Sequence, residues 1–510
     1  MLLAICLWSK NQTALFGLVS HGIVRIEVTA EDGSRSVTWK MQEKLCGAVP
    51  CSRDRHTGKF IGDISAESWR AAGIENPIEQ LSARVSDNGS NMMKGWSDGF
   101  QTPCADHTME LSVKVFTEHE QIRQTLEKGR GLVGYFNSSV IGNKEETVGL
   151  RACQKSAGVP ENSLIQDVKT RWRSCHDMCN SLCINQEPLL LYDVRNSTAA
   201  KGFKDNRYSL EDWQINNQAV ALLTPLATAS QFLEGKTYPT SNLVLPSIYG
   251  CLAHLKPESA IRQPWDGKTL LPEDMRPEVQ EARQALYDDM LQRWRTNMSD
   301  QLRKFYCVAT LCDPRHKSLH FPGMTANEKV EAREWFVAEF DSLWSSRNEF
   351  DGAGVGLQEA AVREKKNWSH SQHSGASFID FMAGMAHHLQ AEDDEAGEDE
   401  VEPEKSEAQL YLDQPAVPLN TDVLQWWAAH EKTYPSLSRM ARQFLGVPAT
   451  SASAERLFSI AGRLYDDLRQ KMKDDMLESL MFARVNRDNR LQRNPAISRV
   501  MDSPDESAPE

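Results

Sequence analysis

Residues Pro448-Ala-Thr-Ser-Ala-Ser-Ala-Glu-Arg-Leu-Phe-Ser459 give the clearest structural signal in this chain. Thr450 and Ser451 follow the proline and are typical of a helix start, because a hydroxyl group accepts a hydrogen bond from a free N–H of the first turn. Apolar residues then recur every three or four positions and so share one helix face. The stripe comprises Leu457, Ile460, Ala461, Leu464 and Leu468. The stretch predicts an amphipathic helix with one buried side.

The surrounding residues extend this signal to a compact helical block from Leu410 to Arg487. Pro435 stands where it can begin a helix, and Gly446 stands where it can end the same helix. Proline has no N–H to lose at a first helical position, and glycine readily leaves the helical conformation. The block therefore predicts a helix between Pro435 and Gly446, before the one that contains the quoted stretch.

A linker is predicted immediately before this block, from about Ser345 to Lys405. It is rich in glycine at first, and between Ala391 and Glu407 ten of seventeen residues are Asp or Glu. Such a composition cannot bury enough apolar surface to fold by itself. We expect the linker to be mostly disordered, with one short helix around residues 378–389. The polar tail after residue 488 is also expected to be disordered.

The first 115 residues read mainly as strands, and the following 230 residues read as helices. Leu15–Val19 and Ile23–Val28 are apolar runs containing β-branched residues, separated by polar residues and glycine. The opening run, Met1–Leu7, has no basic flank and no small-residue cleavage pattern, which favours a strand over a secretory leader. Residues 213–226 and 277–290 show the spacing of amphipathic helices.

Composition limits the class of protein. The 510 residues allow two to four domains and contain no apolar run long enough to span a membrane. The 11 cysteines lack the dense spacing of a disulfide scaffold, which indicates reduced thiols. The net charge of −14 is the wrong sign for a protein that holds nucleic acid over its whole surface, although local basic patches stay possible.

Several separated motifs resemble those of the hAT transposase superfamily, the cut-and-paste recombinases with a DDE active site. They are Trp426-Trp427, Tyr434-Pro-Ser-Leu437, the quoted Pro448–Ser459 stretch, Leu480-Met-Phe-Ala-Arg-Val-Asn486, Val85-Ser-Asp-Asn-Gly-Ser-Asn-Met92, Cys104-Ala-Asp-His107, Thr170-Arg-Trp-Arg-Ser174 and Leu311-Cys-Asp-Pro-Arg-His-Lys317. The resemblance extends from Ile5 to about Asn486 and is nearest to the branch associated with BED zinc fingers. That branch reads DNA through an N-terminal zinc finger of paired Cys and His ligands, a pattern that these 510 residues do not contain.

The resemblance implies an α/β plus α fold, in which a ribonuclease-H-like core is interrupted by a large all-α insertion and completed by C-terminal helices. The expected divisions are residues 1–115 for the first part of the core, 116–344 for the helical insertion, 345–409 for the acidic linker, 410–488 for the dimerisation region that completes the core, and 489–510 for the tail.

The resemblance also implies an active site of three carboxylates that hold two divalent metal ions for phosphodiester transfer. Asp87 matches the second acid and Glu455 matches the third. The first acid of the family ends the first strand in an Asp-x-Trp-[ST] pattern, and this chain has Cys6-Leu-Trp-Ser9 there. Sulfur is a soft ligand with little affinity for magnesium. We therefore expect a catalytically dead descendant of a transposase, with magnesium or manganese bound only if the site still functions.

Other residues acquire candidate roles from the resemblance. Arg171 and Trp172 match a pair that lies near DNA in the family, and His107, in a block beside the former active site, is a third candidate for DNA contact. The alternative for this pair is an ordinary core tryptophan with an arginine on the surface. The candidate dimerisation residues are Trp426, Trp427, Leu457, Phe458, Leu464, Leu480 and Phe482. Burial within one chain is a competing explanation for most of these apolar side chains.

Two sets of cysteines have spacings that suggest metal ligands. Cys104 and His107 lie three residues apart, but a closed zinc site needs four ligands and no second pair accompanies them. Cys175, Cys179 and Cys183 recur every fourth residue along one predicted helix face. Thiols in this arrangement are more often small core residues than ligands. We therefore expect no bound metal at either place.

Three functions remain open at this stage. The first is a non-catalytic nuclear protein that forms at least a dimer through residues 416–487 and contacts double-stranded DNA. The second is an active DDE transposase in which a neighbour such as Asp54 or Asp63 supplies the missing acid. The third is an interaction scaffold without DNA binding. None involves a membrane or a small-molecule substrate, and the nuclear location rests on the family alone.

Overall fold

The structure, a computed structural model, describes residues 2–10, 13–29, 35–51, 56–71, 83–95, 99–138, 149–168, 171–196, 201–343 and 405–464, and also residues 481 and 486. For residues 2–10, 13–15, 50 and 460–464 the structure describes the backbone only. The expected linker helix at 378–389, most of the acidic linker and the tail after 488 lie outside the described residues.

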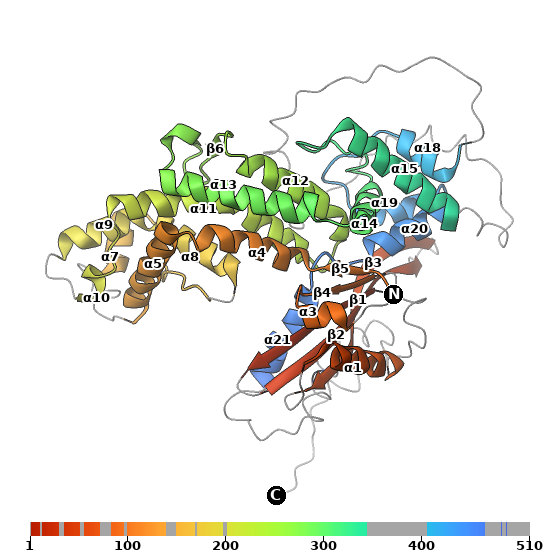
Figure 1. Cartoon of the computed structure of the whole chain (residues 1–510), viewed down its shortest axis with the longest axis horizontal. Helices are drawn as coiled ribbons and strands as arrows, with labels where there is room; N and C mark the ends of the chain where they lie inside the picture. The colour runs from red at the N-terminus through yellow and green to blue at the C-terminus, as the bar shows by residue number, and fades with distance from the viewer. Residues whose placement is uncertain are drawn as a thin grey trace, which may run out of the picture.

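A five-stranded sheet forms the N-terminal part of the fold (Figure 1). Its strands are β1 (Leu2–Lys10), β2 (Thr13–Thr29), β3 (Arg35–Pro50), β4 (Ala83–Ser86) and β5 (Gln101–Pro103), in the spatial order β3-β2-β1-β4-β5. The first three strands are antiparallel, whereas β4 runs parallel to β1 and β5 runs parallel to β4. The opening residues thus form a strand, as expected.

Strand β2 joins two apolar runs that the sequence presents as separate. The polar residues between them, Ser20 and His21, were expected to break the strand, but both are buried. The Ser20 hydroxyl donates to the carbonyl of Lys44, and a ring nitrogen of His21 lies 2.8 Å from the hydroxyl oxygen of Ser453. Polar residues therefore continue the strand where their side chains find partners inside the protein.

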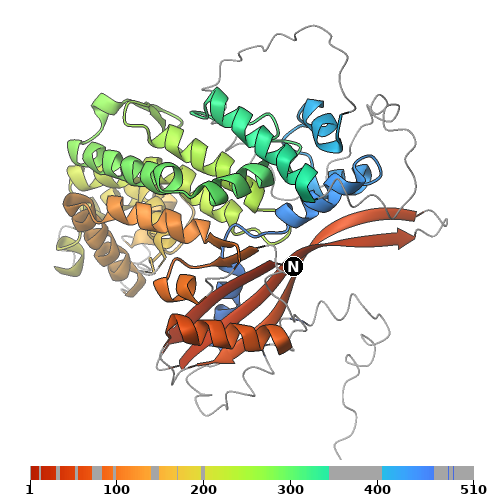
Figure 2. The ribbon, with the colours of Figure 1, turned by 45° about the vertical axis from the view of Figure 1, so that its right-hand side comes forward.

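Two helices cover opposite faces of the sheet (Figure 2). Helix α1 (Gly58–Ala71) packs with Phe16 and Leu18 of β2 in a small core. Gly17 lies between these two residues and so faces the other side. There the ring of Phe458, on α21 (Ala452–Leu464), lies 3.1 Å from the position that a Cβ atom on Gly17 would take. A side chain at position 17 would therefore crowd the ring of Phe458, which would have to shift by a few tenths of an ångström.

A large helical part follows the sheet and extends away from it (Figure 1). Its elements are α4 (Ala105–Thr117), α5 (Glu120–Ser138), α7 (Leu150–Ser156), α8 (Trp172–Ile184), α9 (Gln186–Arg195), α10 (Lys201–Lys204), α11 (Leu210–Leu233), η1 (Ser241–Leu243), α12 (Val244–Leu255), the β6 (Ile261–Arg262) and β7 (Thr269–Leu270) hairpin, η2 (Pro272–Asp274), α13 (Pro277–Leu291), η3 (Gln292–Thr296), α14 (Asp300–Leu311) and α15 (Ala326–Leu343). The short helix α3 (Ser90–Lys94) lies between β4 and β5 in the chain and packs against α1 beside the sheet. The helices expected at 213–226 and 277–290 are confirmed as parts of α11 and α13.

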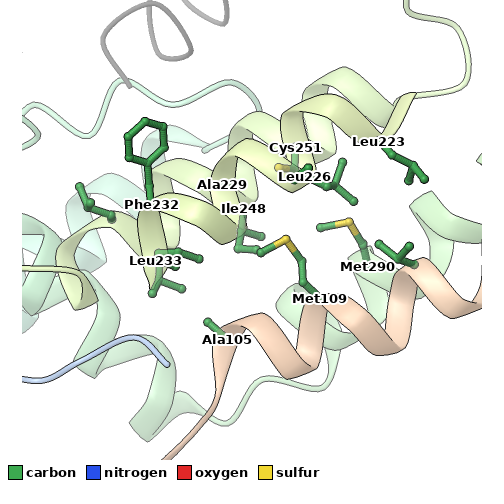
Figure 3. Close-up of a cluster of buried hydrophobic side chains, with 14 of the residues drawn as sticks. Ala105, Met109, Leu223, Leu226, Ala229, Phe232, Leu233, Ile248, Cys251 and Met290 are labelled. Atoms are coloured by element: carbon green, nitrogen blue, oxygen red, sulfur yellow. The ribbon is translucent and has the colours of Figure 1, made fainter. Parts of the chain in front are cut away.

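Helix α4 connects the sheet to the core of this helical part. Its residues Ala105 and Met109 point toward α11 and α12, where Leu226 and Ile248 line the same cluster (Figure 3). All four side chains are almost completely buried. A helix of 13 residues that begins directly after the last strand therefore anchors the helical part to the sheet.

The C-terminal block is also helical, as expected. It contains α18 (Glu407–Asp413), α19 (Val423–His430), α20 (Pro435–Leu445) and α21. Pro435 is the first residue of α20 and Gly446 is its C-cap, so both boundary predictions are confirmed. Helix α18 begins with a capping box formed by Ser406 and Gln409, so ordered structure starts slightly before the expected end of the linker at residue 409. The mixed class, an α/β part and a larger α part, is confirmed.

The helices that the structure describes include none with the length and apolar character needed to cross a membrane.

Asn486, the last residue of one motif, caps the edge of the sheet. Strand β3 is an edge strand, and edge strands leave backbone groups without partners. The side-chain amide of Asn486 accepts a hydrogen bond from the N–H of Leu45 at 3.1 Å and donates to the carbonyl of Leu45 at 3.3 Å. This side chain therefore takes the place of one residue of a neighbouring strand.

We expect Asn486→Ala to lower the free energy of unfolding by about 1–3 kcal/mol, because it leaves both backbone groups of a buried residue without partners. Asn486→Asp should have a similar effect, since a carboxylate can accept from the N–H of Leu45 but cannot donate to its carbonyl. Urea denaturation measures both variants. A change below about 0.5 kcal/mol, the usual size for a surface substitution, would show that the amide does not stabilise the edge.

Candidate functional site

The stretch from Gly446 to Ala454 is a buried junction between the three parts of the chain. The carbonyl of Ala449 accepts from the N–H of Ala105 at 3.0 Å, and the N–H of Ala449 donates to the hydroxyl of Thr240 at 2.9 Å. The N–H of Ser451 donates to the sulfur of Cys104 at 3.4 Å. Small residues are required here because the start of α4, the end of α11 and this loop approach one another closely.

Cys104 contributes to this junction as a packing residue. Its thiol is buried and also accepts from the N–H of His107, so it caps the start of α4. Burial raises the pKa of the Cys104 thiol to about 12, with a smaller contribution from the negative charge of Asp106. A neutral thiol is a poor metal ligand. Cys104 therefore joins helix α4 to the C-terminal loop.

The register of the sheet brings the first two motif positions together. Strand β1 pairs with β4 in parallel, and the last paired residues are Ile5 and Ser86. Cys6 and Asp87 are the next residue on each strand. They are therefore neighbours at the edge of the sheet where β4 ends, while β1 continues to Lys10.

Asp87 is partly exposed at this edge and forms a tight turn. Its carboxylate accepts from the N–H of Gly89 at 3.1 Å. The next residue, Asn88, donates from its side chain to the hydroxyl of Thr108 on α4 at 2.9 Å. The hydrogen bond from Gly89 is typical of an Asp side chain that forms a turn with its own backbone.

Glu455 lies in the first turn of α21, on the side of the sheet opposite α1. Its carboxylate accepts a long hydrogen bond of 3.4 Å from the hydroxyl of Ser451, one turn earlier. The residue is exposed, yet partial burial of its carboxyl group raises its pKa, and the negative charge of Asp106 raises it further. Helix α21 packs against β1 and β2, and β1 is the strand that contains Cys6 (Figure 1).

Helix α4 supplies further charged groups between these positions. The carboxyl group of Asp106 accepts from the hydroxyl of Ser230 on α11, and its burial raises its pKa. His107 lies 3.2 Å from a carboxylate oxygen of Glu110, and this contact is the main reason for its raised pKa. The charge of Asp87 contributes to the same shift. The described contacts connect Asp87 and Glu455 only indirectly, through residues of α4.

Arg171 and Trp172 occupy different environments at the start of α8. Arg171 is exposed, and its positive charge acts on the carboxyl group of Glu455. Trp172 is buried, with 8% of its surface exposed, beside the carboxyl group of Asp106. Arg173 forms an ion pair of 2.9 Å with Glu234 at the end of α11. Of these three residues, only Arg171 is classed as exposed. Trp172 would have to leave its buried position before its ring could stack on a base.

The residues at this edge do not fit the two-metal centre that the family resemblance implies. Two hard metal ions need three carboxylates that converge, and position 6 supplies a thiol. Among the described residues, no group of three or more His, Cys, Asp and Glu side chains is arranged to hold a metal ion. Of the two suggested replacement acids, Asp63 is exposed on α1, on the other face of the sheet, and Asp54 lies outside the described residues.

The candidate dimerisation residues with described side chains pack mostly within the chain. Trp427 is fully buried, Leu457 and Phe458 are nearly so, and Trp426 is partly buried against His430, with ring centroids 3.9 Å apart. The side chain of Leu464 and the residues Leu480 and Phe482 lie outside what the structure describes. Their role in dimerisation stays a prediction.

A buried polar network between β2, β3 and α21 was not foreseen from the sequence. His21 and Ser453 are hydrogen-bonded, and Arg456 links Glu43 at 2.8 Å to the carbonyl of Glu234 at 3.0 Å. Burial lowers the pKa of His21 to about 3, and the positive charge of Arg456 adds to this effect. These partners are separated by more than 200 residues in sequence, and the His21–Ser453 and Glu43–Arg456 pairs by more than 400, so no local pattern could reveal them.

The lowered pKa of His21 predicts a loss of stability in mild acid. The ordinary pKa is 6.5, so the unfolded chain gains a proton below that pH while the folded imidazole stays neutral until about pH 3. Stability should therefore fall as the pH falls through this window, by up to about 1.4 kcal/mol per pH unit for this one group. His21→Gln keeps a polar partner for Ser453 and should show a shallower slope in urea unfolding between pH 7 and pH 5. Equal slopes would contradict the burial of a neutral His21.

Comparison with known proteins identifies the class of the C-terminal block. Residues 407–486 match the hAT family C-terminal dimerisation region. This range begins at α18 and ends at Asn486, the residue that caps β3. The chain therefore carries a hAT dimerisation region, and the resemblance to the hAT superfamily is confirmed.

The relatives of the chain include proteins of both kinds that the motifs suggested. It is 22% identical to human Zinc finger BED domain-containing protein 4 over 94% of this chain and 37% of that protein. It is also 22% identical to the Putative AC transposase of Zea mays over 87% of this chain and 52% of that protein. A shorter match, 35% identical over 16% of this chain, is to the DAYSLEEPER protein of Arabidopsis thaliana. The matched part of the chain thus spans about two fifths of the human protein and about one half of the maize protein.

Proposed function

We propose that this chain is a catalytically degenerate, nuclear hAT transposase-like protein that self-associates through its C-terminal region and contacts DNA. The observation that supports the loss of catalysis is the pairing of Ile5 with Ser86, which makes Cys6 of β1 a neighbour of Asp87, the residue that follows β4. A transposase needs an acid at the position of Cys6. A thiol there removes one of the oxygen ligands on which two-metal phosphodiester transfer depends.

The proposed core is ribonuclease-H-like. The sheet order β3-β2-β1-β4-β5, with three antiparallel strands followed by two parallel ones, supports this proposal. So does the position of α21, which comes from the end of the chain and packs on the first strands of the sheet. In such an arrangement the insertion separates the second acid from the third in sequence, as the helical part separates Asp87 from Glu455 here.

Nicking of supercoiled plasmid DNA in manganese tests the loss of catalysis without knowledge of a target sequence. Glu455→Gln removes the third candidate acid and sets the background level of nicking. We expect the unmodified chain to nick no more than this background. Cys6→Asp should gain metal-dependent nicking that is lost again when Glu455→Gln is added. Robust nicking by the unmodified chain that depends on Glu455 would instead support an active transposase.

DNA contact is proposed through the exposed Arg171 beside the candidate site. The logarithm of the affinity for double-stranded DNA should fall linearly with the logarithm of the salt concentration, with a slope set by the number of phosphate contacts. Arg171→Gln should reduce that slope by the amount that corresponds to about one contact. Arg123→Gln is a suitable control, because Arg123 is exposed on α5 and paired with Glu120 and Glu127. Negligible binding at low salt would favour the scaffold alternative.

Self-association rests on the match to the dimerisation region. Light scattering on the full chain at micromolar concentration should give at least a dimer. Leu480→Glu combined with Phe482→Glu should yield a monomer, because interfaces lose affinity when charge enters their apolar centre. Val330→Glu, at a position that is 55% exposed on α15, is the control. A monomeric unmodified chain would contradict this part of the proposal.

A further inference from the structure

The hairpin of β2 and β3 extends past β1 and leaves one edge of β2 open. Strand β1 pairs with β2 only as far as His21, whereas β3 stays paired with β2 as far as Thr29. Figure 2 shows this two-stranded extension beyond the rest of the sheet. Among the described residues, the segment Gly22–Thr29, called the open edge below, has β3 as its only strand partner. Such an edge is a template for another strand.

The outer edge of β3, by contrast, is partly covered by side chains of the C-terminal block. The N–H and the carbonyl of Leu45 are both bonded to Asn486, and the carbonyl of Trp39 accepts from the side-chain amide of Gln425 at 3.1 Å. These backbone groups of Leu45 and Trp39 therefore point away from β2.

This direction determines which backbone groups of β2 face the open edge. Trp39 lies opposite Arg25, so their pair is one of those in which the two residues do not exchange hydrogen bonds. Because such pairs alternate with hydrogen-bonded pairs, Ile23, Arg25 and Glu27 direct their N–H and carbonyl groups toward the open edge, while Ile26 bonds to β3. No hydrogen bond joins these outward groups to another described residue.

The sequence of the open edge is complementary to itself. When two copies lie antiparallel with Ile26 opposite Ile26, Arg25 of each copy lies opposite Glu27 of the other, and Val24 lies opposite Val28. The outward backbone groups of Arg25 then meet those of Glu27. Centring the pair on Arg25 or on Glu27 would instead place two like charges directly opposite each other, which is destabilising.

An apolar stripe follows the same pairing on one face of the hairpin. Arg25 forms an ion pair of 2.9 Å with Glu431 on α19, so alternate residues of β2 face away from α19. These residues are Val24, Ile26 and Val28, and Val28 is 45% exposed. Pairing of two copies would join the two stripes into one continuous apolar strip.

We propose that two copies of this chain join their sheets through the open edge, with Ile26 at the two-fold axis. The inference rests on the proposed self-association, because so short a strand pair buries less than the roughly 1,200 Å² of a stable interface. The contact with Glu431 shows that the open edge adjoins the block that matches the dimerisation region. The C-terminal contact holds the two copies together, and the open edge fixes their register.

Cysteine cross-linking of the full chain with diamide tests the register directly. Ile26→Cys places two thiols in a pair whose Cα atoms are about 4.5 Å apart, so a disulfide-linked dimer should form rapidly. Val24→Cys alone should cross-link far more slowly, since the two copies of position 24 would lie about 13 Å apart along the strands. Val24→Cys combined with Val28→Cys should cross-link rapidly. Lys40→Cys, at an exposed position of β3, measures chance collisions, and the unmodified chain sets the background.

A proline at position 27 separates pairing between copies from pairing within the chain. The N–H of Glu27 points to the open edge, so Glu27→Pro removes no hydrogen bond between β2 and β3. It does remove one bond to Arg25 from each copy. Added to Ile26→Cys, it should slow cross-linking by about tenfold or more. Glu27→Ala keeps the N–H and should slow cross-linking less.

Thermal unfolding shows that each variant is folded, and light scattering on the same samples separates this inference from the proposed self-association. A dimer in which Ile26→Cys cross-links no faster than Lys40→Cys or Val24→Cys would overturn the pairing of open edges and leave self-association in place. Cross-linking of Ile26→Cys that Glu27→Pro does not slow would also overturn it. A monomer would overturn both.

Discussion

Trp427→Ala should lower the free energy of unfolding by about 3–5 kcal/mol, the usual cost of removing a large buried aromatic side chain. Trp427 is completely buried, and its indole N–H donates to the carbonyl of Cys312 at 2.8 Å. Its ring stacks with Trp39 of β3 and packs against Tyr411 of α18. One side chain thus holds together the sheet, the segment after α14 and the start of the dimerisation region. Urea unfolding followed by circular dichroism measures the loss.

Two further variants separate packing from hydrogen bonding at this position. Trp427→Phe keeps part of the ring volume but loses the donor to Cys312, so a smaller loss of about 1–3 kcal/mol is expected. Trp265→Ala removes a tryptophan that is 38% exposed, and its effect should be markedly smaller than that of Trp427→Ala. Equal effects of Trp427→Ala and Trp265→Ala would mean that Trp427 does not belong to the core of the single chain.

Asp313→Ala should destabilise the protein by about 3–5 kcal/mol, because it leaves a buried arginine without its counter-charge. The Asp313 carboxylate is fully buried and pairs with Arg315 at 2.7 Å. It also accepts from the side-chain amide of Asn242 at 2.6 Å. This group lies in the Leu311–Lys317 motif, which the sequence marked as a family landmark without giving it a role. Asp313 holds Arg315, which also donates to the carbonyl of Leu419 at 3.4 Å and so joins the helical part to the C-terminal block.

The ionisation of Asp313 gives this prediction a pH signature. Burial alone would raise the pKa of its carboxyl group, but the charges of Arg315 and His316 and the hydrogen bonds from Arg315 lower it to about 2. The stabilisation is therefore present above the ordinary pKa of 3.8 and is lost as the pH falls toward 2. Asp193→Ala is the matched control, since its ion pair with Arg207 is exposed and should contribute at most about 1 kcal/mol. Equal losses for the two variants would contradict the buried pair.

Local patterns predicted the helix boundaries and the strand-rich start well. Pro435 and Gly446 bound α20 because proline and glycine act through their own backbone preferences, which need no tertiary context. The strand break expected at Ser20 and His21 was wrong because these residues depend on tertiary contacts. Both residues look like a break in an apolar run, and only partners brought from β3 and α21 make them acceptable inside the sheet.

The candidate site was predictable only in part for the same reason. Asp87 and Glu455 could be named from motifs, and the register of β1 and β4 now explains why Cys6 and Asp87 belong together. By contrast, the contact between Cys104 and Ser451 joins residues 347 positions apart. The small residues of the Pro448–Ser459 stretch resemble a family signature in sequence, and in the fold they are the closely packed junction of all three parts.

Equilibrium binding of manganese, followed by electron paramagnetic resonance on the metal-free chain, tests the central claim that position 6 lacks a necessary oxygen ligand. This measurement needs no DNA target. We predict no saturable site that depends on Asp87 and Glu455 in the unmodified chain, and one new site in Cys6→Asp that disappears when Glu455→Gln is added. Tight manganese binding by the unmodified chain that is abolished by Asp87→Asn or by Glu455→Gln would contradict the loss of the metal centre.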